Sequence, residues 1–128
     1  MTDIHTHDKI DQQLCGRPVH IKDGNSRVEL VTIPEMAADG IGLVHGGFVF
    51  GLADYAAMLA VNHPNVVLGS AAVKFLQPVK VGDILVAAAS VETVNGKKQV
   101  VDVLVQNGDI SVFSGSFTCF VLETHVLD

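Results

Sequence analysis

The sequence has no tryptophan and only two cysteines, and aromatic side chains make up just 5% of its 128 residues. Hydrophobic residues nevertheless reach 48%, with a mean hydropathy of +0.40. The chain can therefore fill a core, but mainly with valine, leucine, isoleucine and alanine. No internal repeat, low-complexity tract or linker divides it, and its length is typical of one domain. We expect residues 1–128 to form a single domain.

Positive charge is also scarce. Eight lysines and arginines stand against 14 acidic residues, which gives a net charge of −6 with no run of one sign. Such a chain is a poor non-specific binder of nucleic acid or of an anionic membrane. Its longest apolar run, residues 55–61, is far below the ~18 residues of a membrane-spanning helix. We expect neither nucleic acid nor membrane as a partner.

The two cysteines, Cys15 and Cys119, do not form a C-x-x-C pair, so a thiolate zinc site or a thioredoxin-type site is not expected. The polar start MTDIHTHDKID lacks a secretion signal. This favours a cytoplasmic protein with two free thiols, although one disulfide is formally open. The histidines of His5-Thr6-His7 could be half a metal site, but no partner ligands are evident. We expect no metal and no redox cofactor.

Strand-like runs surround one helical segment. Asn95-Gly96 lies between two such runs, which is a strong signal for a hairpin. The segment 5–14 is either a short polar helix or irregular. We expect two strands, one long helix that stops at Asn62–Asn65, and then a four-stranded antiparallel meander. The expected strands are 17–24, 26–33, 66–77, 84–94, 98–106 and 110–122.

The helical segment, LVHGGFVFGLADYAAMLAVN at 43–62, is apolar over most of its circumference. A helix of this kind must be enclosed. The simplest enclosure is a curved antiparallel sheet wrapped around it, which is an α+β architecture. The edges and outer face of such a sheet need protection. We therefore expect a homodimer or a dimer of dimers.

One carboxylate, Asp54, interrupts the apolar helix. A buried and unpaired carboxylate is costly, so Asp54 is either exposed, paired with a base such as Lys74, or required for function. Gly51, one turn earlier on its face, costs about 1 kcal/mol relative to alanine and indicates room for a ligand or a close backbone. Gly46-Gly47 at the helix start either make a tight turn or expose N–H groups that stabilise negative charge.

The segment HGGFVFGLAD, residues 45–54, resembles the HGG(x)6D signature of hotdog-fold acyl-CoA thioesterases of the phenylacetic-acid-degradation (PaaI-like) type. The resemblance extends over roughly residues 14–123 and includes VVLGSAAVKFLQPVKVGD after the helix. It implies a hotdog fold, in which a sheet wraps one long central helix. It also implies hydrolysis of an acyl- or aryl-CoA thioester to the free acid and CoA.

The resemblance assigns roles to single positions. Gly46 would donate its N–H to the thioester carbonyl oxygen, and Asp54 would be the nucleophile or the general base. His45 would shape the donor loop or touch the substrate. Relatives often place asparagine six residues before this histidine, in contact with substrate or water. Here that position is Asp39, a departure that matters near an anionic intermediate.

Three further residues are candidate substrate contacts. Gly47 clears space for the substrate, or simply turns the chain into the helix. Ser70 positions the attacking water, or faces a neighbouring strand. Lys80 binds the phosphates of coenzyme A, or is an ordinary solvated lysine.

Two other functions compete with hydrolysis. The first is a non-catalytic acyl-CoA-binding hotdog module of a lipid-responsive regulator, which would have no use for the Asp54 carboxylate. The second is a hotdog dehydratase, which relies on a different Asp/His arrangement that the sequence does not show.

Helix geometry separates the two principal candidates. Asp54 follows Gly46 by eight residues, or about 12 Å along a helix axis. Both must come within roughly 3.5 Å of one thioester group. One straight helix cannot achieve this, whereas an antiparallel helix from a second copy can. We therefore expect an active site shared between two chains.

Overall fold

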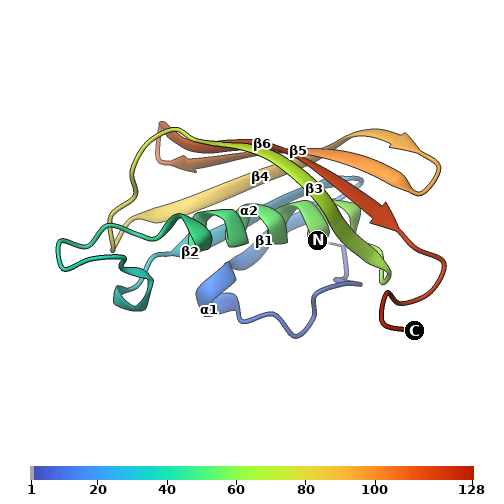
Figure 1. Ribbon diagram of the computed structural model, residues 1–128, viewed down its shortest axis with the longest axis horizontal. Coiled ribbons are helices and arrows are strands. Elements are labelled where there is room, and N and C mark those ends of the chain that lie inside the picture. Colours follow the sequence, from blue (N-terminus) through green and yellow to red (C-terminus); the bar gives the residue numbers. More distant parts are fainter. Residues whose placement is uncertain (1) are drawn as a thin grey trace.

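The computed structural model describes residues 2–128, which form a six-stranded antiparallel sheet wrapped around one long helix (Figure 1). This is the expected α+β hotdog architecture. The helices are α1 (Gln12–Cys15), the 3-10 helix η1 (Pro34–Met36) and α2 (Gly46–Val61). The strands are β1 (Arg17–Lys22), β2 (Asn25–Val31), β3 (Val66–Phe75), β4 (Ile84–Asn95), β5 (Lys98–Asn107) and β6 (Ile110–Val121).

The strand order is β1-β2-β4-β5-β6-β3. The tight turns Asn95–Lys98 and Asn107–Ile110 make β4, β5 and β6 a meander, as expected. The expectation that β3 joins this meander beside β4 is wrong. β3 pairs with β6 at the far edge of the sheet, and β4 pairs with β2 instead. The chain therefore leaves β2, crosses the concave face of the sheet as α2, and emerges at the opposite edge.

Helix α2 begins and ends where the local sequence requires. His45 is the N-cap residue with extended backbone, and Gly46 is the first helical residue. At the other end Asn62 adopts the left-handed conformation, with a φ of 51°, and its N–H bonds to the Met58 carbonyl. Asparagine tolerates this conformation better than most residues, and Pro64 follows shortly afterwards. The helix therefore stops at the predicted place.

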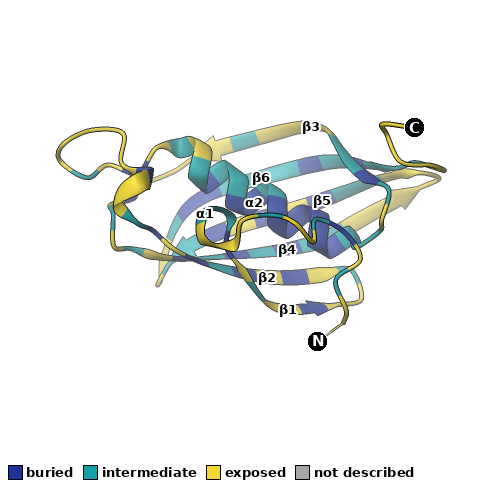
Figure 2. Cartoon of the chain, turned by 90° about the horizontal axis from the view of Figure 1, so that it is seen from below, coloured by how far each residue is buried: buried dark blue, intermediate teal, exposed yellow. Residues whose placement is uncertain are grey.

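The second half of α2 is buried on every side. Its sheet side packs on β2, β4 and β5, and the Ser26 hydroxyl donates a 2.6 Å hydrogen bond to the Ala56 carbonyl. On the other side lies the N-terminal segment with α1 (Figure 2). The Asn62 side chain holds this segment, because it bonds to the His5 N–H and to the Asp3 carbonyl, each at 2.8 Å. Tyr55 is consequently only 1% exposed.

The two edges of the sheet differ in character. Strand β1 carries Arg17, Pro18 and Lys22 and has a register irregularity at Pro18–His20, all of which discourage further pairing. Strand β3 is ten residues long and is largely exposed after its first three residues. Lys74 is its one charged residue. It therefore lacks the usual protection against pairing with another strand.

Two findings bear on the sequence expectations. Both cysteines are free thiols, Cys119 buried and Cys15 half-buried. Across the described chain, α2 and the shorter helices lack the length and continuous apolar character needed to span a bilayer.

Candidate active site

The start of α2 is held by backbone hydrogen bonds between two loops. The Val44 N–H donates to the Val79 carbonyl at 2.8 Å, and the Val81 N–H donates to the Gly42 carbonyl at 2.9 Å. The His45 N–H donates to the Met36 carbonyl at 2.9 Å. The loop that leads into the helix is thus attached to the β3–β4 connection, and the first turn has a defined position.

Gly46 and Gly47 are the first two residues of α2, where backbone N–H groups have no partner within the helix. Neither N–H donates a hydrogen bond to any group in residues 2–128. Two donors therefore remain available at the positive end of the helix dipole. Such a geometry can stabilise an oxyanion, and the role of Gly46 as the donor stays a prediction.

The His45 side chain folds over this first turn and makes no capping hydrogen bond. A Cβ atom added at Gly47 would lie 3.0 Å from the imidazole atoms Cδ2 and Nε2. The ring also meets Phe48 edge-on, with 6.2 Å between centroids. Gly47 therefore leaves space for the His45 ring, which lies beside the free donors.

Gly46 has a close neighbour of its own. A Cβ atom added there would lie 3.1 Å from Cε1 of Phe75, a residue at the end of β3. The Phe75 ring packs edge-on against Phe113, at 5.1 Å between centroids. Glycine at position 46 therefore leaves space for the Phe75 ring, which would have to shift to accommodate a side chain there.

Asp54 lies two turns farther along α2. Its Oδ1 atom is fully buried and has no hydrogen-bond partner within residues 2–128. The ion pair among these residues joins Arg17 to Glu29 at 3.6 Å, so the alternative that Asp54 pairs with Lys74 is wrong. Burial raises the pKa of Asp54 to about 6. A carboxylate that is desolvated and uncompensated is typical of functional sites.

Two thiols lie near this carboxylate. The pKa of Cys119 on β6 is raised to about 12, mainly by burial and further by the negative charge of Asp54. The pKa of Cys15 is also raised, by burial first and then by Asp11 and Asp54. Both thiols therefore stay uncharged at physiological pH. They contribute no charge that would offset the carboxylate of Asp54. The sequence offered no signal for this proximity, because the three residues come from distant segments.

Asp39 is exposed and directed into its own loop. Its Oδ1 atom accepts the N–H groups of Ile41, Gly42 and Leu43 at 2.9, 3.0 and 3.2 Å. These bonds lower its pKa, with the Leu43 contribution the largest. The extra acid therefore organises the loop before α2 and is ionised at neutral pH.

Ser70 and Lys80 are not brought to Asp54 within one chain. Ser70 pairs with Thr118, whose neighbours Phe117 and Cys119 are fully buried, so Ser70 lies on the opposite face of the sheet from α2. Lys80 is exposed near the start of α2. Its backbone N–H donates to Asp83 Oδ2 at 2.9 Å, and its side chain forms no ion pair among residues 2–128.

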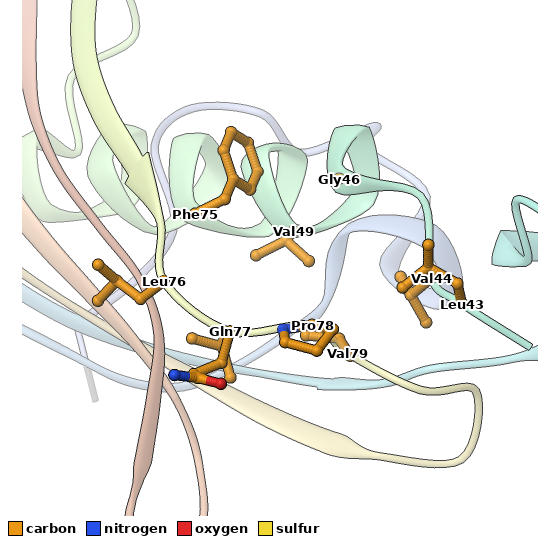
Figure 3. A pocket seen from close by; sticks show the side chains of 10 residues that line it. Leu43, Val44, Gly46, Val49, Phe75, Leu76, Gln77, Pro78 and Val79 are labelled. Carbon is orange, nitrogen blue, oxygen red and sulfur yellow. The ribbon is translucent and has the colours of Figure 1, made fainter.

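A 340 Å³ pocket opens beside the first turn of α2 (Figure 3). Gln77 has the one polar side chain among its ten lining residues, and Phe75 forms one wall. Val49 projects from α2 toward the segment that carries Leu76 and Pro78. Sequence reasoning missed Phe75, because the only local signal is an aromatic residue between Lys74 and Leu76.

The profile of the Thioesterase superfamily matches residues 41–114, which include the helix start, Asp54, the strands β3 to β5 and the beginning of β6. Among curated proteins, a segment of methylthioribose-1-phosphate isomerase from Aquifex aeolicus is 53% identical over 122 residues, covering 94% of this chain and 27% of that protein. The transcription factor FapR of Caldanaerobacter subterraneus is 35% identical over 66% of this chain and 42% of its own length. The chain thus spans well under half of these relatives.

Solved structures agree with the fold. An uncharacterized protein from Pyrococcus horikoshii is 56% identical with a TM-score of 0.98, covering 99% of this chain and 98% of its own. A variant of the phenylacetic acid degradation protein PaaI from Thermus thermophilus is 26% identical with a TM-score of 0.79, covering 85% and 95%. A hypothetical thioesterase from Streptococcus pneumoniae, solved with coenzyme A, shares the fold at 23% identity, a TM-score of 0.78 and 85% and 87% coverage. The chain therefore belongs to the thioesterase superfamily of hotdog-fold proteins.

Proposed function

We propose that this protein is an acyl-CoA thioesterase whose active site is completed by a second copy of the chain. The observation that carries the proposal is the buried, unpaired oxygen of Asp54, with a pKa raised to about 6 by burial. Such a site opposes the charge of the carboxylate. A chain with no use for the charge would be more stable with an apolar residue here.

The proposed reaction divides the work between two elements. The free N–H groups of Gly46 and Gly47 stabilise the negative charge that develops on the thioester carbonyl oxygen. Asp54 either attacks the carbonyl carbon or removes a proton from the attacking water. The carbon–sulfur bond then breaks, and the CoA thiolate takes up a proton. Where Asp54 itself attacks, this step leaves the acyl group on Asp54 as a mixed anhydride, which water hydrolyses to release the acid and restore the carboxylate. Water supplies the oxygen and hydrogen that balance the products, a carboxylic acid and CoA.

A second copy is needed because α2 runs without interruption from Gly46 to Val61. The donor and the carboxylate are then about 12 Å apart along the axis. We propose that the unprotected β3 edge pairs with β3 of the partner, and that the two antiparallel α2 helices bring each Gly46 to the other chain's Asp54. His45 and Gly47 then border the site. Lys80, on the adjacent connection, is the proposed contact for CoA phosphates.

The FapR similarity favours one alternative, a non-catalytic acyl-CoA-binding module. Ser70 and Asp39 do not separate the two functions, because neither lies against Asp54 within the chain. Asp54 does separate them. A binder gains nothing from a desolvated carboxylate in a site that receives a polarised carbonyl group.

A thiol-release assay with a panel of acyl-CoAs tests the proposal. The wild type should release CoA, and Asp54→Asn should lower kcat by on the order of 100-fold or more with the fold intact. Asp109→Asn, in the exposed β5–β6 turn, is the matched control and should retain full activity. Undiminished turnover in Asp54→Asn would contradict the assigned role. Tight acyl-CoA binding without turnover by the wild type would favour the binding module.

A further inference from the structure

The 340 Å³ pocket beside Gly46 has the size and lining of a ligand site. Small-molecule sites typically begin at roughly 300 Å³, and a cavity of about 150 Å³ can hold a benzene molecule. The pocket reaches Gly46, whose N–H is free. A group bound by its carbonyl at this N–H would therefore have space for an apolar tail directly beside it.

We propose that this pocket receives the acyl group of the substrate and that Phe75 determines which acyl groups fit. This inference rests on the thioesterase function proposed above and names its substrate class: thioesters of uncharged, apolar acyl groups. Phe75 is the specificity-determining residue, because its ring is both a wall of the pocket and the nearest neighbour of Gly46.

The lining excludes charged acyl groups. Within residues 2–128, the pocket wall contains aliphatic side chains, Phe75 and the amide of Gln77, with no charged side chain. Lys80 and Asp83 line a neighbouring hollow instead. A terminal carboxylate on the acyl chain would lose its hydration here without gaining a cation, and this is costly.

Phe75 is held on one side only. Its ring rests edge-on against Phe113, which is fully buried, yet Phe75 itself is 57% exposed. It is the last residue of the edge strand β3. The absence of a side chain at Gly46 leaves room for the ring at 3.1 Å from the ideal Cβ position. The ring therefore occupies space beside Gly46, and its size limits the volume of the pocket.

The test separates binding from turnover. Non-hydrolysable S-alkyl-CoA thioethers, from butyl to decyl, are titrated by calorimetry into the wild type, Phe75→Ala and Phe75→Trp. The corresponding acyl-CoAs are assayed for turnover in parallel. Ile110→Ala is the matched control, because Ile110 has a similar exposure of 56% but lies in the β5–β6 hairpin. Light scattering verifies that each variant keeps the wild-type mass.

Phe75→Ala should extend the preferred chain, with affinity rising about fourfold for each methylene added just beyond the wild-type optimum. Phe75→Trp should shorten it, and Ile110→Ala should leave the order unchanged. Thioethers that end in a carboxylate should bind the wild type at least about 100-fold more weakly than uncharged analogues of equal length.

Two failures are distinguishable. If chain-length preference moves with residue 75 but no thioester is hydrolysed, the pocket inference stands and the thioesterase function is wrong. If thioesters are hydrolysed but both Phe75 variants keep the wild-type order, the acyl group lies elsewhere and the inference is overturned. Equal affinity for carboxylate-terminated and uncharged thioethers would overturn the substrate class.

Discussion

At the scale of single residues, Asp54 has surroundings that oppose the charge required for its proposed role. Burial raises its pKa to about 6, and no basic side chain among residues 2–128 offsets this. The carboxylate is ionised above this pH and neutral below it. Only the ionised form can attack a carbonyl carbon or accept a proton from water.

The activity should therefore have an acidic limb set by Asp54. We expect kcat/KM for an acyl-CoA to rise tenfold per pH unit below about pH 6 and to level off above it. A pH series between 4.5 and 8.5 measures this limb. Asp109→Asn should give the same profile. A limb centred near pH 4, the usual value for aspartate, would show that burial does not govern the catalytic group.

The same burial makes Asp54 a cost to stability at neutral pH. Its folded-state pKa lies above the unfolded value of 3.8, so its contribution is most favourable below that pH and is lost as pH rises through about 6. Asp54→Asn should therefore raise the free energy of unfolding at pH 8 by roughly 1 to 3 kcal/mol and change it little at pH 4. Denaturant unfolding at both pH values measures the difference. An equal change in the free energy of unfolding at pH 4 and pH 8 would indicate that the substitution acts through packing and not through the loss of charge.

For Asp39, which lies in the loop before α2, we expect that removing the charge does not lower the activity. Its Oδ1 atom accepts three backbone N–H groups of its own loop, and an asparagine oxygen can accept the same bonds. Asp39→Asn should keep or raise kcat/KM at pH 7, whereas Asp39→Ala should lower it by loosening the loop. A collapse of activity in Asp39→Asn would make Asp39 an acid or base in the reaction.

At the scale of elements, local sequence was a good guide wherever the structure depends on neighbouring residues. Asn95-Gly96 and Asn107-Gly108 form the tight β4–β5 and β5–β6 connections, and Asn62 ends α2. The position of β3 in the sheet depends on where the 16-residue helix α2 ends relative to the other strands. No local sequence pattern encodes this position. The motif HGG(x)6D pointed to the free N–H groups at the helix start and to Asp54, whose roles stay predictions, whereas the contact between Phe75 and Gly46 joins distant segments and could not be foreseen.

The free edge of β3 leads to a prediction about assembly. A lysine in the middle of an unprotected edge discourages pairing with a second copy. Ala72→Lys should therefore weaken the dimer and lower the activity in parallel, most strongly at low protein concentration. Light scattering and kcat/KM are measured over a dilution series.

Val19→Lys is the matched control, because it adds the same charge to β1, the edge that already contains proline and basic residues. Its mass and activity should equal those of the wild type. Loss of the dimer in Val19→Lys but not in Ala72→Lys would move the interface to the other edge.

At the scale of the whole molecule, the two groups proposed for catalysis, the Gly46 N–H and the Asp54 carboxylate, are separated within one chain. Gly46 begins α2 beside the apolar pocket, and Asp54 lies about two turns farther along the helix, near Cys119. The sheet closes around α2 on one side, and the N-terminal segment covers the other. The β3 side is left for a partner, so assembly and catalysis should be inseparable.

Mixing two inactive variants tests this arrangement directly. Gly46→Val forces a side chain against Phe75 and disturbs the donor, and Asp54→Ala removes the carboxylate. In a mixed dimer, a shared site receives either both defects or neither. Random pairing makes half of the dimers mixed, and each has one intact site of two, so co-expression should restore roughly a quarter of wild-type activity. Each variant mixed with itself serves as the control and should stay inactive. If the mixture forms dimers of normal mass yet remains inactive, donor and carboxylate act within one chain, and α2 must bend during the reaction to bring them together.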